Sequence, residues 1–128
     1  GKYEEAIENM NKAIEIEPNP AFYNNLAYSY ELMEDFDKAL ECYDKGLEID
    51  SNDAMIYNNK GWALKKVGRY DESIECYQDA IELDYCSHYL KNLAIVYKEL
   101  GQMDKAHELY DMAYELDDSI ESFEEIRN

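Results

Sequence analysis

Apolar residues recur along the chain at the spacing of an α-helix. Over residues 36–47 the apolar or small positions are Phe36, Ala39, Leu40, Tyr43, Gly46 and Leu47. Intervals of three and four place these side chains on one helical face. Residues 26–30 and 93–97 share a second pattern, Leu-Ala-x-x-Tyr. Gly68 and Gly101 stand where these first helices must end, a position that favours a residue tolerating positive φ. The pattern predicts pairs of helices joined by short turns.

The chain also lines up with itself when it is shifted by 33 or 34 residues. Two columns of small residues and one column that is mostly tyrosine carry this repeat. They are Ala6, Ala39, Ser73 and Ala106; Ala13, Gly46, Ala80 and Ala113; and Met10, Tyr43, Tyr77 and Tyr110. One helical hairpin cannot bury its apolar face alone, so the period predicts stacked hairpins with a continuous core. The expected fold class is an all-α solenoid.

Short side chains are expected where the two helices of each hairpin cross, because long ones would hold the helices apart. On the first helices these residues are Ala27, Gly61 and Ala94. On the second helices they are Ala39, Ser73 and Ala106.

Composition narrows the class of partner. The 128 residues suit one domain, and 30 Asp and Glu against 12 Lys and Arg give a formal net charge of −18. That balance argues against nucleic acid and against an anionic membrane surface, because both require basic residues. With 46% apolar residues the chain is no acidic disordered tail, and no apolar run approaches the roughly 18 residues of a membrane span. Three cysteines without a CxxC pair favour a reducing, cytoplasmic compartment.

These columns resemble the tetratricopeptide repeat. The matching positions are Leu26, Ala27, Tyr30, Phe36, Ala39, Tyr43 and Gly46; then Gly61, Leu64, Gly68, Tyr70, Ser73, Tyr77 and Ala80; then Leu93, Ala94, Tyr97, Gly101, Ala106, Tyr110 and Ala113. Pro18 resembles the proline that closes a repeat. Departures that weaken individual turns are Lys60 for Leu, Glu34 for Gly, and Ser51, Tyr85 and Asp118 for Pro. The resemblance implies a right-handed superhelical solenoid of antiparallel helix pairs, with the first helices on its concave side.

The repeat boundaries follow from this resemblance. Residues 1–19 would supply the second helix of a truncated repeat, 20–53, 54–86 and 87–120 would form full repeats, and 121–128 would begin a further helix. The first helix offers Ala6, Ile7, Met10 and Ile14 with no partner helix before it. We therefore expect the chain to be a piece of a longer array.

The resemblance also implies a function, the capture of a peptide segment of another protein in the concave groove. The expected groove residues are Asn24, Asn25, Tyr28, Met55, Asn58, Asn59, Trp62, Lys65, Lys91, Asn92, Ile95 and Lys98. Further positions expected to face it are Ala21, Glu31, Leu32, Lys66, His88 and Glu99. The first helices carry five Lys against two Glu, a net +3, which leaves −21 elsewhere. This mildly basic face favours an acidic ligand or a free C-terminus.

Some family members hold a terminal carboxylate in a clamp of Lys, Asn and Arg. Here Asn25, Asn59, Asn92 and Lys91 occupy clamp positions. Tyr28, Trp62 and Ile95 replace a required Asn, and Ala21, Met55 and His88 replace a required Lys. The clamp is incomplete, so binding of chaperone C-termini is not expected.

Other chemistry is weakly represented. No Gly-rich phosphate loop, Ser-His-Asp arrangement or HExxH motif is present. Cys86 and His88 lack further ligands for a metal, Cys42 and Cys76 are expected in the core, and His107 is expected to pack. The sequence therefore predicts no enzyme, no cofactor and no metal.

The alternative function is a structural element that self-assembles through exposed terminal helices into a homo-oligomer. A helical repeat that binds RNA is a distant third, disfavoured by the charge.

Overall fold

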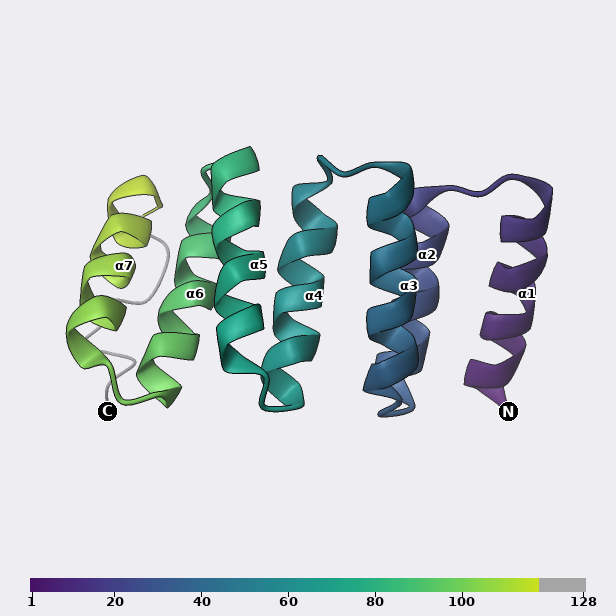
Figure 1. Ribbon diagram of the computed structural model, residues 1–128, viewed down its shortest axis with the longest axis horizontal. Coiled ribbons are helices and arrows are strands. Elements are labelled where there is room, and N and C mark those ends of the chain that lie inside the picture. Colours follow the sequence, from purple (N-terminus) through teal and green to yellow (C-terminus); the bar gives the residue numbers. More distant parts are fainter. Residues whose placement is uncertain (118–128) are drawn as a thin grey trace.

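The computed structural model describes residues 1–117, and this part of the chain is built from helices without strands. The helices are α1 (Lys2–Ile16), α2 (Pro20–Leu32), α3 (Phe36–Ile49), α4 (Ala54–Lys66), α5 (Tyr70–Leu83), α6 (Ser87–Glu99) and α7 (Met103–Leu116). They follow one another along the long axis of the molecule (Figure 1). The predicted all-α repeat solenoid is confirmed. The end of the third repeat, 118–120, and the further helix expected over 121–128 lie outside the described residues.

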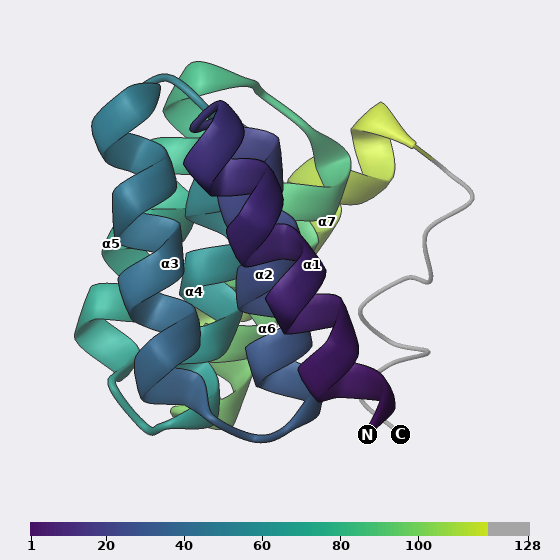
Figure 2. The same ribbon diagram turned by 90° about the vertical axis from the view of Figure 1, so that its right-hand side faces the viewer.

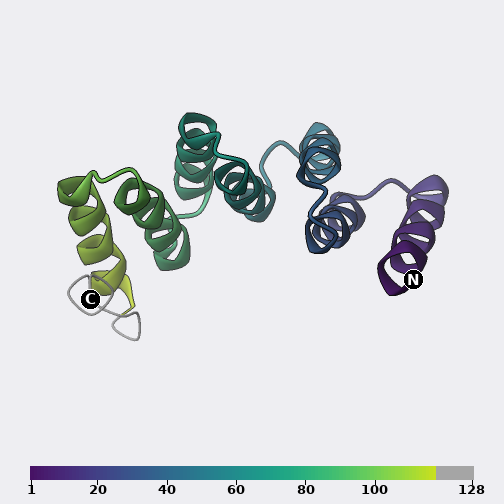
Figure 3. The ribbon, with the colours of Figure 1, turned by 90° about the horizontal axis from the view of Figure 1, so that it is seen from below.

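The helices pack as three antiparallel pairs with one additional helix at the N-terminal end. α2 packs against α3, α4 against α5 and α6 against α7, whereas α1–α2, α3–α4 and α5–α6 contacts join successive units. Seen along the array, the units lie one behind another (Figure 2). From below they form an arc with α2, α4 and α6 in the inner row and α3 and α5 in the outer row (Figure 3). The inner row is the surface on which the predicted groove residues lie.

The three first helices end in the same way. At the end of α2, the Glu34 N–H donates to the Glu31 carbonyl at 2.8 Å and the Asp35 N–H donates to the Tyr30 carbonyl at 2.9 Å. This Schellman arrangement recurs after α4 and α6 and requires a left-handed residue after the helix. Gly68 and Gly101 have φ of 82° and 80°, and Glu34 adopts φ 60° at the equivalent place. The glycine positions predicted from the sequence are confirmed, and Glu34 takes the same conformation despite its side chain.

The core is made by the columns of small and tyrosine residues. Tyr43, Tyr77 and Tyr110 are each 1% exposed, and the alanines at the helix crossings are completely buried. At Gly61 a Cβ would lie 3.0–3.1 Å from the ring of Tyr77. Short side chains at the crossings therefore allow the close approach that the sequence predicted.

Two sequence expectations are corrected by the packing. Ile7, Met10 and Ile14 do not form an open face, because they are half-buried against the core cluster that includes Leu26. The reason is that α1 turns this face toward α2, the helix against which it packs. His107 does not pack, because it lies on the exposed side of α7, with Nε2 3.5 Å from Asp111 Oδ2.

The two equivalent cysteines occupy the core as expected. Cys42 and Cys76 are 6% and 7% exposed. Burial raises the pKa of each thiol to about 11. Both thiols are therefore protonated at neutral pH and act as apolar filler.

Candidate functional site

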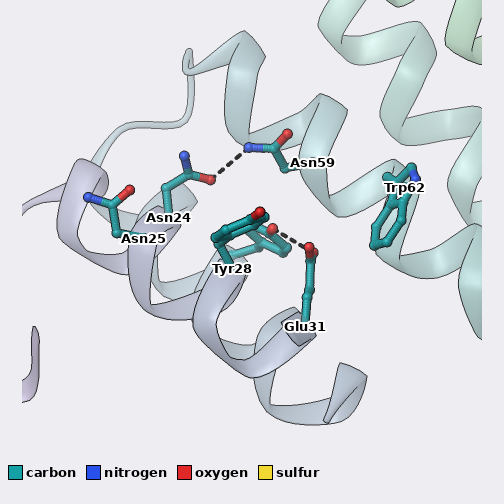
Figure 4. A pocket seen from close by; sticks show the side chains of 7 residues that line it. Asn24, Asn25, Tyr28, Glu31, Asn59 and Trp62 are labelled. Carbon is teal, nitrogen blue, oxygen red and sulfur yellow. Dashed lines mark hydrogen bonds between the residues drawn. The ribbon is translucent and has the colours of Figure 1, made fainter. Parts of the chain in front are cut away.

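A cavity of about 280 Å³ opens on the inner row of helices, between the first and second full repeats. Its walls are Asn24, Asn25, Tyr28 and Glu31 from α2, Tyr43 from α3, and Asn59 and Trp62 from α4. Figure 4 shows Tyr28 and Trp62 on opposite sides of this space, with the amide groups of Asn24 and Asn59 along one edge. The volume is slightly below the range of roughly 300–1,000 Å³ typical of small-molecule sites. It suits a single side chain of a partner.

The structure brings together five of the twelve predicted groove residues in this cavity. They are Asn24, Asn25, Tyr28, Asn59 and Trp62. The other seven lie outside it: Met55, Asn58 and Lys65 on α4, and Lys91, Asn92, Ile95 and Lys98 on α6. They belong to the same inner row of helices, and their part in binding stays a prediction.

Two aromatic side chains are available to a ligand. Tyr28 is 59% exposed and Trp62 is 37% exposed, although most aromatic rings of this chain pack into the fold. The Trp62 ring lies 6.3 Å from the Phe36 ring, and Lys66 Nζ lies 5.1 Å from the Trp62 ring centroid. These contacts limit the rotamers of Trp62, so the ring is partly pre-organised.

Asparagine side chains link all three full repeats along the inner row. Asn92 Nδ2 donates to Asn58 Oδ1 at 2.8 Å, and Asn59 Nδ2 donates to Asn24 Oδ1 at 2.9 Å. A longer contact of 3.5 Å from Asn58 Nδ2 to Asn59 Oδ1 connects the two. Asn58 is only 8% exposed, so this residue supports the groove from beneath. Asn24 and Asn59 keep further amide atoms at the cavity wall.

Glu31 and Tyr43 form the polar floor of the cavity. The Tyr43 hydroxyl donates to Glu31 Oε1 at 2.6 Å. Burial raises the pKa of the Glu31 carboxyl, and the hydrogen bond from Tyr43 partly opposes that rise. Burial, together with this carboxylate, raises the pKa of Tyr43 far above its ordinary value. The sequence analysis assigned Tyr43 to the scaffold only, and missed that it also lines the cavity. The available signal was its hydroxyl, because a buried tyrosine needs a hydrogen-bond partner nearby.

The lysines of the inner row are less available than their number indicates. Lys65 Nζ lies 3.6 Å from Glu99 Oε1, and its side chain is only 15% exposed. Lys60 Nζ lies 2.6 Å from Asp44 Oδ1 on α3. These pairings neutralise two of the five lysines that made the groove basic by composition.

Metal-ligand clusters and membrane-spanning helices are both absent from residues 1–117. Within this range, no three or more His, Cys, Asp or Glu side chains are grouped so that they could hold a metal ion. None of the helices from α1 to α7 is long and apolar enough to cross a membrane.

Comparison with known proteins gives one consistent family. Family models described as tetratricopeptide repeat match residues 20–85 and 52–119, and a further one matches residues 1–20. A crystal structure of MamA is 25% identical, with a TM-score of 0.82 over 91% of this chain and 70% of that chain. A second MamA structure is 20% identical, with a TM-score of 0.81 over 90% of this chain and 64% of that chain. This chain thus spans about two thirds of those proteins. No curated protein matches it.

Proposed function

The chain belongs to the tetratricopeptide repeat family, a family of protein-interaction and scaffold modules, and from this premise we propose that it captures a peptide segment of a partner protein. The segment lies along the inner row of helices and anchors one side chain in the cavity between α2 and α4. The proposed role is binding without catalysis.

The observation that carries this proposal is the pair of exposed aromatic rings across the cavity. Tyr28 and Trp62 present large apolar area to solvent, and residues of these types dominate the binding energy of many interfaces. The amide groups of Asn24 and Asn59 lie beside them and suit the N–H and C=O groups of an extended peptide. A ligand would therefore find an apolar anchor next to polar partners for its backbone.

The remaining predicted residues extend the groove toward the third repeat. Lys91 and Lys98 lie on α6, where we propose that they face acidic side chains or the free C-terminus of the ligand. Met55, Asn92 and Ile95 are assigned to the same stretch of the groove.

The experiment is selection of peptides from a random peptide display library on the immobilised chain. Binding of a selected peptide is then compared for wild type and for Tyr28→Ala with Trp62→Ala. We expect the double substitution to weaken binding by at least 100-fold, since each buried aromatic anchor contributes roughly 2 kcal/mol or more. The matched control is Tyr85→Ala with Tyr114→Ala, which removes two exposed tyrosines outside the cavity. Equal binding by the two double variants would refute the proposal.

End-to-end assembly is the second candidate function, and α1 is the feature that favours it. α1 contains no fully buried residue, and it leaves Ile16 86% and Tyr3 42% exposed. A second copy could cover these side chains. Light scattering over a range of protein concentrations tests this, with Ile16→Glu as the variant expected to abolish the association. A wild-type chain that stays monomeric at high concentration would rule it out.

A further inference from the structure

Glu31 is the one charged side chain among the seven that line the cavity. Its Oε1 accepts the hydrogen bond from Tyr43. Within residues 1–117, Oε2 takes part in no hydrogen bond or ion pair. A half-buried carboxylate with an unused oxygen beside an open cavity lacks the compensation that buried charges usually have.

The neighbouring cations are engaged elsewhere. Lys65 lies in the last turn of α4, at the position equivalent to Glu31 in the second repeat, and it pairs with Glu99. Lys66 lies over the Trp62 ring at 5.1 Å from its centroid. In the described part of the chain no Lys or Arg forms an ion pair with Glu31. Glu31 is therefore the one formal charge among the lining side chains, and it is negative, although the inner row as a whole counts as basic.

We propose that the cavity between α2 and α4 accepts a cationic side chain of the partner peptide, with arginine favoured over lysine. This inference rests on the peptide-binding function proposed above and specifies the chemistry of the anchored residue. The side chain enters between the rings of Tyr28 and Trp62, and its charged end meets Glu31.

The rings and the carboxylate recognise complementary parts of an arginine. A guanidinium is planar and weakly hydrated, so it stacks on aromatic faces and still donates to a carboxylate. An ammonium is a compact, strongly hydrated charge that gains less from two flanking rings. The contact of Lys66 with Trp62 shows that this ring already accepts a cation on one side. The volume of about 280 Å³ suits one extended side chain.

The charge at one repeat position changes sign along the groove. The twelfth position of each full repeat is Glu31 in the first, Lys65 in the second and Lys98 in the third. A ligand with a basic residue in the cavity and acidic residues toward α6 would match both ends. Such a ligand would be complementary both to the lysines of the inner row and to the Glu31 carboxylate in the cavity.

The test uses peptides selected from the same display library. The anchored arginine of a selected peptide is replaced by citrulline, which keeps the shape and removes the charge, and separately by lysine, norleucine and glutamate. Trp62 is the only tryptophan of the chain, so its fluorescence reports occupation of the cavity directly. We expect about a tenfold or larger loss for citrulline and a smaller loss for lysine.

The protein side of the test is Glu31→Gln, which keeps an oxygen for the Tyr43 hydroxyl and removes the charge. The matched control is Glu48→Gln, an exposed position of α3 that removes the same charge from the same repeat. We expect Glu31→Gln to weaken the arginine peptide about tenfold and to leave the citrulline peptide unchanged, because the two changes remove one shared interaction. Glu48→Gln should change neither. Circular dichroism confirms that the variants fold.

The outcomes separate this inference from the proposed function. Selected peptides that lack a basic residue but lose binding with Tyr28→Ala and Trp62→Ala would overturn the cation site and support the peptide groove. Arginine peptides that bind Glu31→Gln as well as wild type would also overturn it. A library that yields no peptide dependent on Tyr28 and Trp62 would overturn both.

Discussion

Ser73 donates a 2.6 Å hydrogen bond from its hydroxyl to the backbone carbonyl of Gly61, and this bond ties α5 to α4 inside the core. The flanking repeats have alanine at both equivalent positions, Ala27 with Ala39 and Ala94 with Ala106. The middle repeat thus uses a smaller residue on one helix and a polar residue on the other. At this crossing a hydrogen bond between the helices stands where the flanking repeats have two alanine side chains.

The first prediction concerns this pair. Gly61→Ala should lower the free energy of unfolding by about 1 kcal/mol, because overpacking costs about 1–3 kcal/mol and the better helix propensity of alanine returns about 1 kcal/mol. The clash is with Tyr77, whose buried ring lies 3.0–3.1 Å from the added Cβ. Adding Ser73→Ala recreates the pair of the flanking repeats, so the double variant should lose less than the two single losses combined. Urea denaturation of all four proteins measures this, and strict additivity would contradict the coupling.

The second prediction uses the one non-glycine residue with positive φ in the described part of the chain, Glu34 at φ 60°. Glu34→Gly should raise the free energy of unfolding by about 0.5–1 kcal/mol. Relief of a left-handed conformation gains about 1–2 kcal/mol, and the greater freedom of the unfolded glycine takes back part of it. Thermal unfolding measures the change. The same substitution inside a helix, at exposed Glu75 in the middle of α5, is the control, and Glu75→Gly should be destabilising by about 1 kcal/mol.

The third prediction concerns the asparagine links of the inner row. Asn58→Ala removes a side chain that is only 8% exposed and leaves the half-buried Asn92 amide without its 2.8 Å acceptor. We expect a loss of about 0.5–1.5 kcal/mol in unfolding free energy, the net contribution of one hydrogen bond, because the donor that loses its acceptor is only half-buried. Asn25→Ala, a change at the exposed residue next to Asn24, should alter stability by less than about 0.5 kcal/mol. Equal effects in chemical denaturation would show that the links do not stabilise the stack.

The fourth prediction follows from the direction of the Glu31 pKa. Burial raises that pKa in the folded protein, so the folded state binds a proton more readily than the unfolded state and stability falls as pH rises through the raised value. Glu31→Gln should therefore be slightly more stable than wild type at pH 7. The advantage should shrink as pH is lowered and the wild-type carboxyl becomes neutral. The melting temperatures of wild type and Glu31→Gln, compared from pH 7 downward, measure this difference. A variant less stable than wild type at pH 7 would contradict the prediction.

The fifth prediction concerns the cysteines. With a pKa of about 11, the thiols of Cys42 and Cys76 hold only about one part in a thousand as reactive thiolate at pH 8, and burial blocks access as well. A thiol reagent should modify half-buried Cys86 in the native protein and reach the other two only after unfolding. Mass spectrometry of the labelled peptides measures this. Simultaneous labelling of all three would show that the core opens readily.

The scaffold was predictable because the repeat imposes the same environment on every column. Tyr43, Tyr77 and Tyr110 had to be buried together, since each occupies one place in an identical hairpin. The positive φ at Gly68 and Gly101 followed in the same way, whereas Glu34 at the end of α2 was expected only to weaken its turn. Each of these inferences uses only the spacing of residues within one repeat and its neighbours.

The site was predicted only in part, because its details depend on pairings between repeats. Lys65 was counted as a basic groove residue, but Glu99 in the next repeat neutralises it. Asn58 was placed on the groove surface, but the next unit covers it. A net charge calculated from composition does not show which of the charged side chains are paired with one another. The sign of a small cavity depends instead on which side chains remain unpaired beside it.

The absence of buried residues in α1 has a consequence for the dynamics of the array. Every later helix from α2 to α7 contributes at least two such residues, whereas α1 contributes none. In a linear array each unit is held by its nearest neighbours, so opening starts at the unit with the weakest interface. Backbone amides of α1 should exchange with deuterated solvent first and those of α4 and α5 last. Slower exchange in α1 would then be a direct sign that another helix has docked against it.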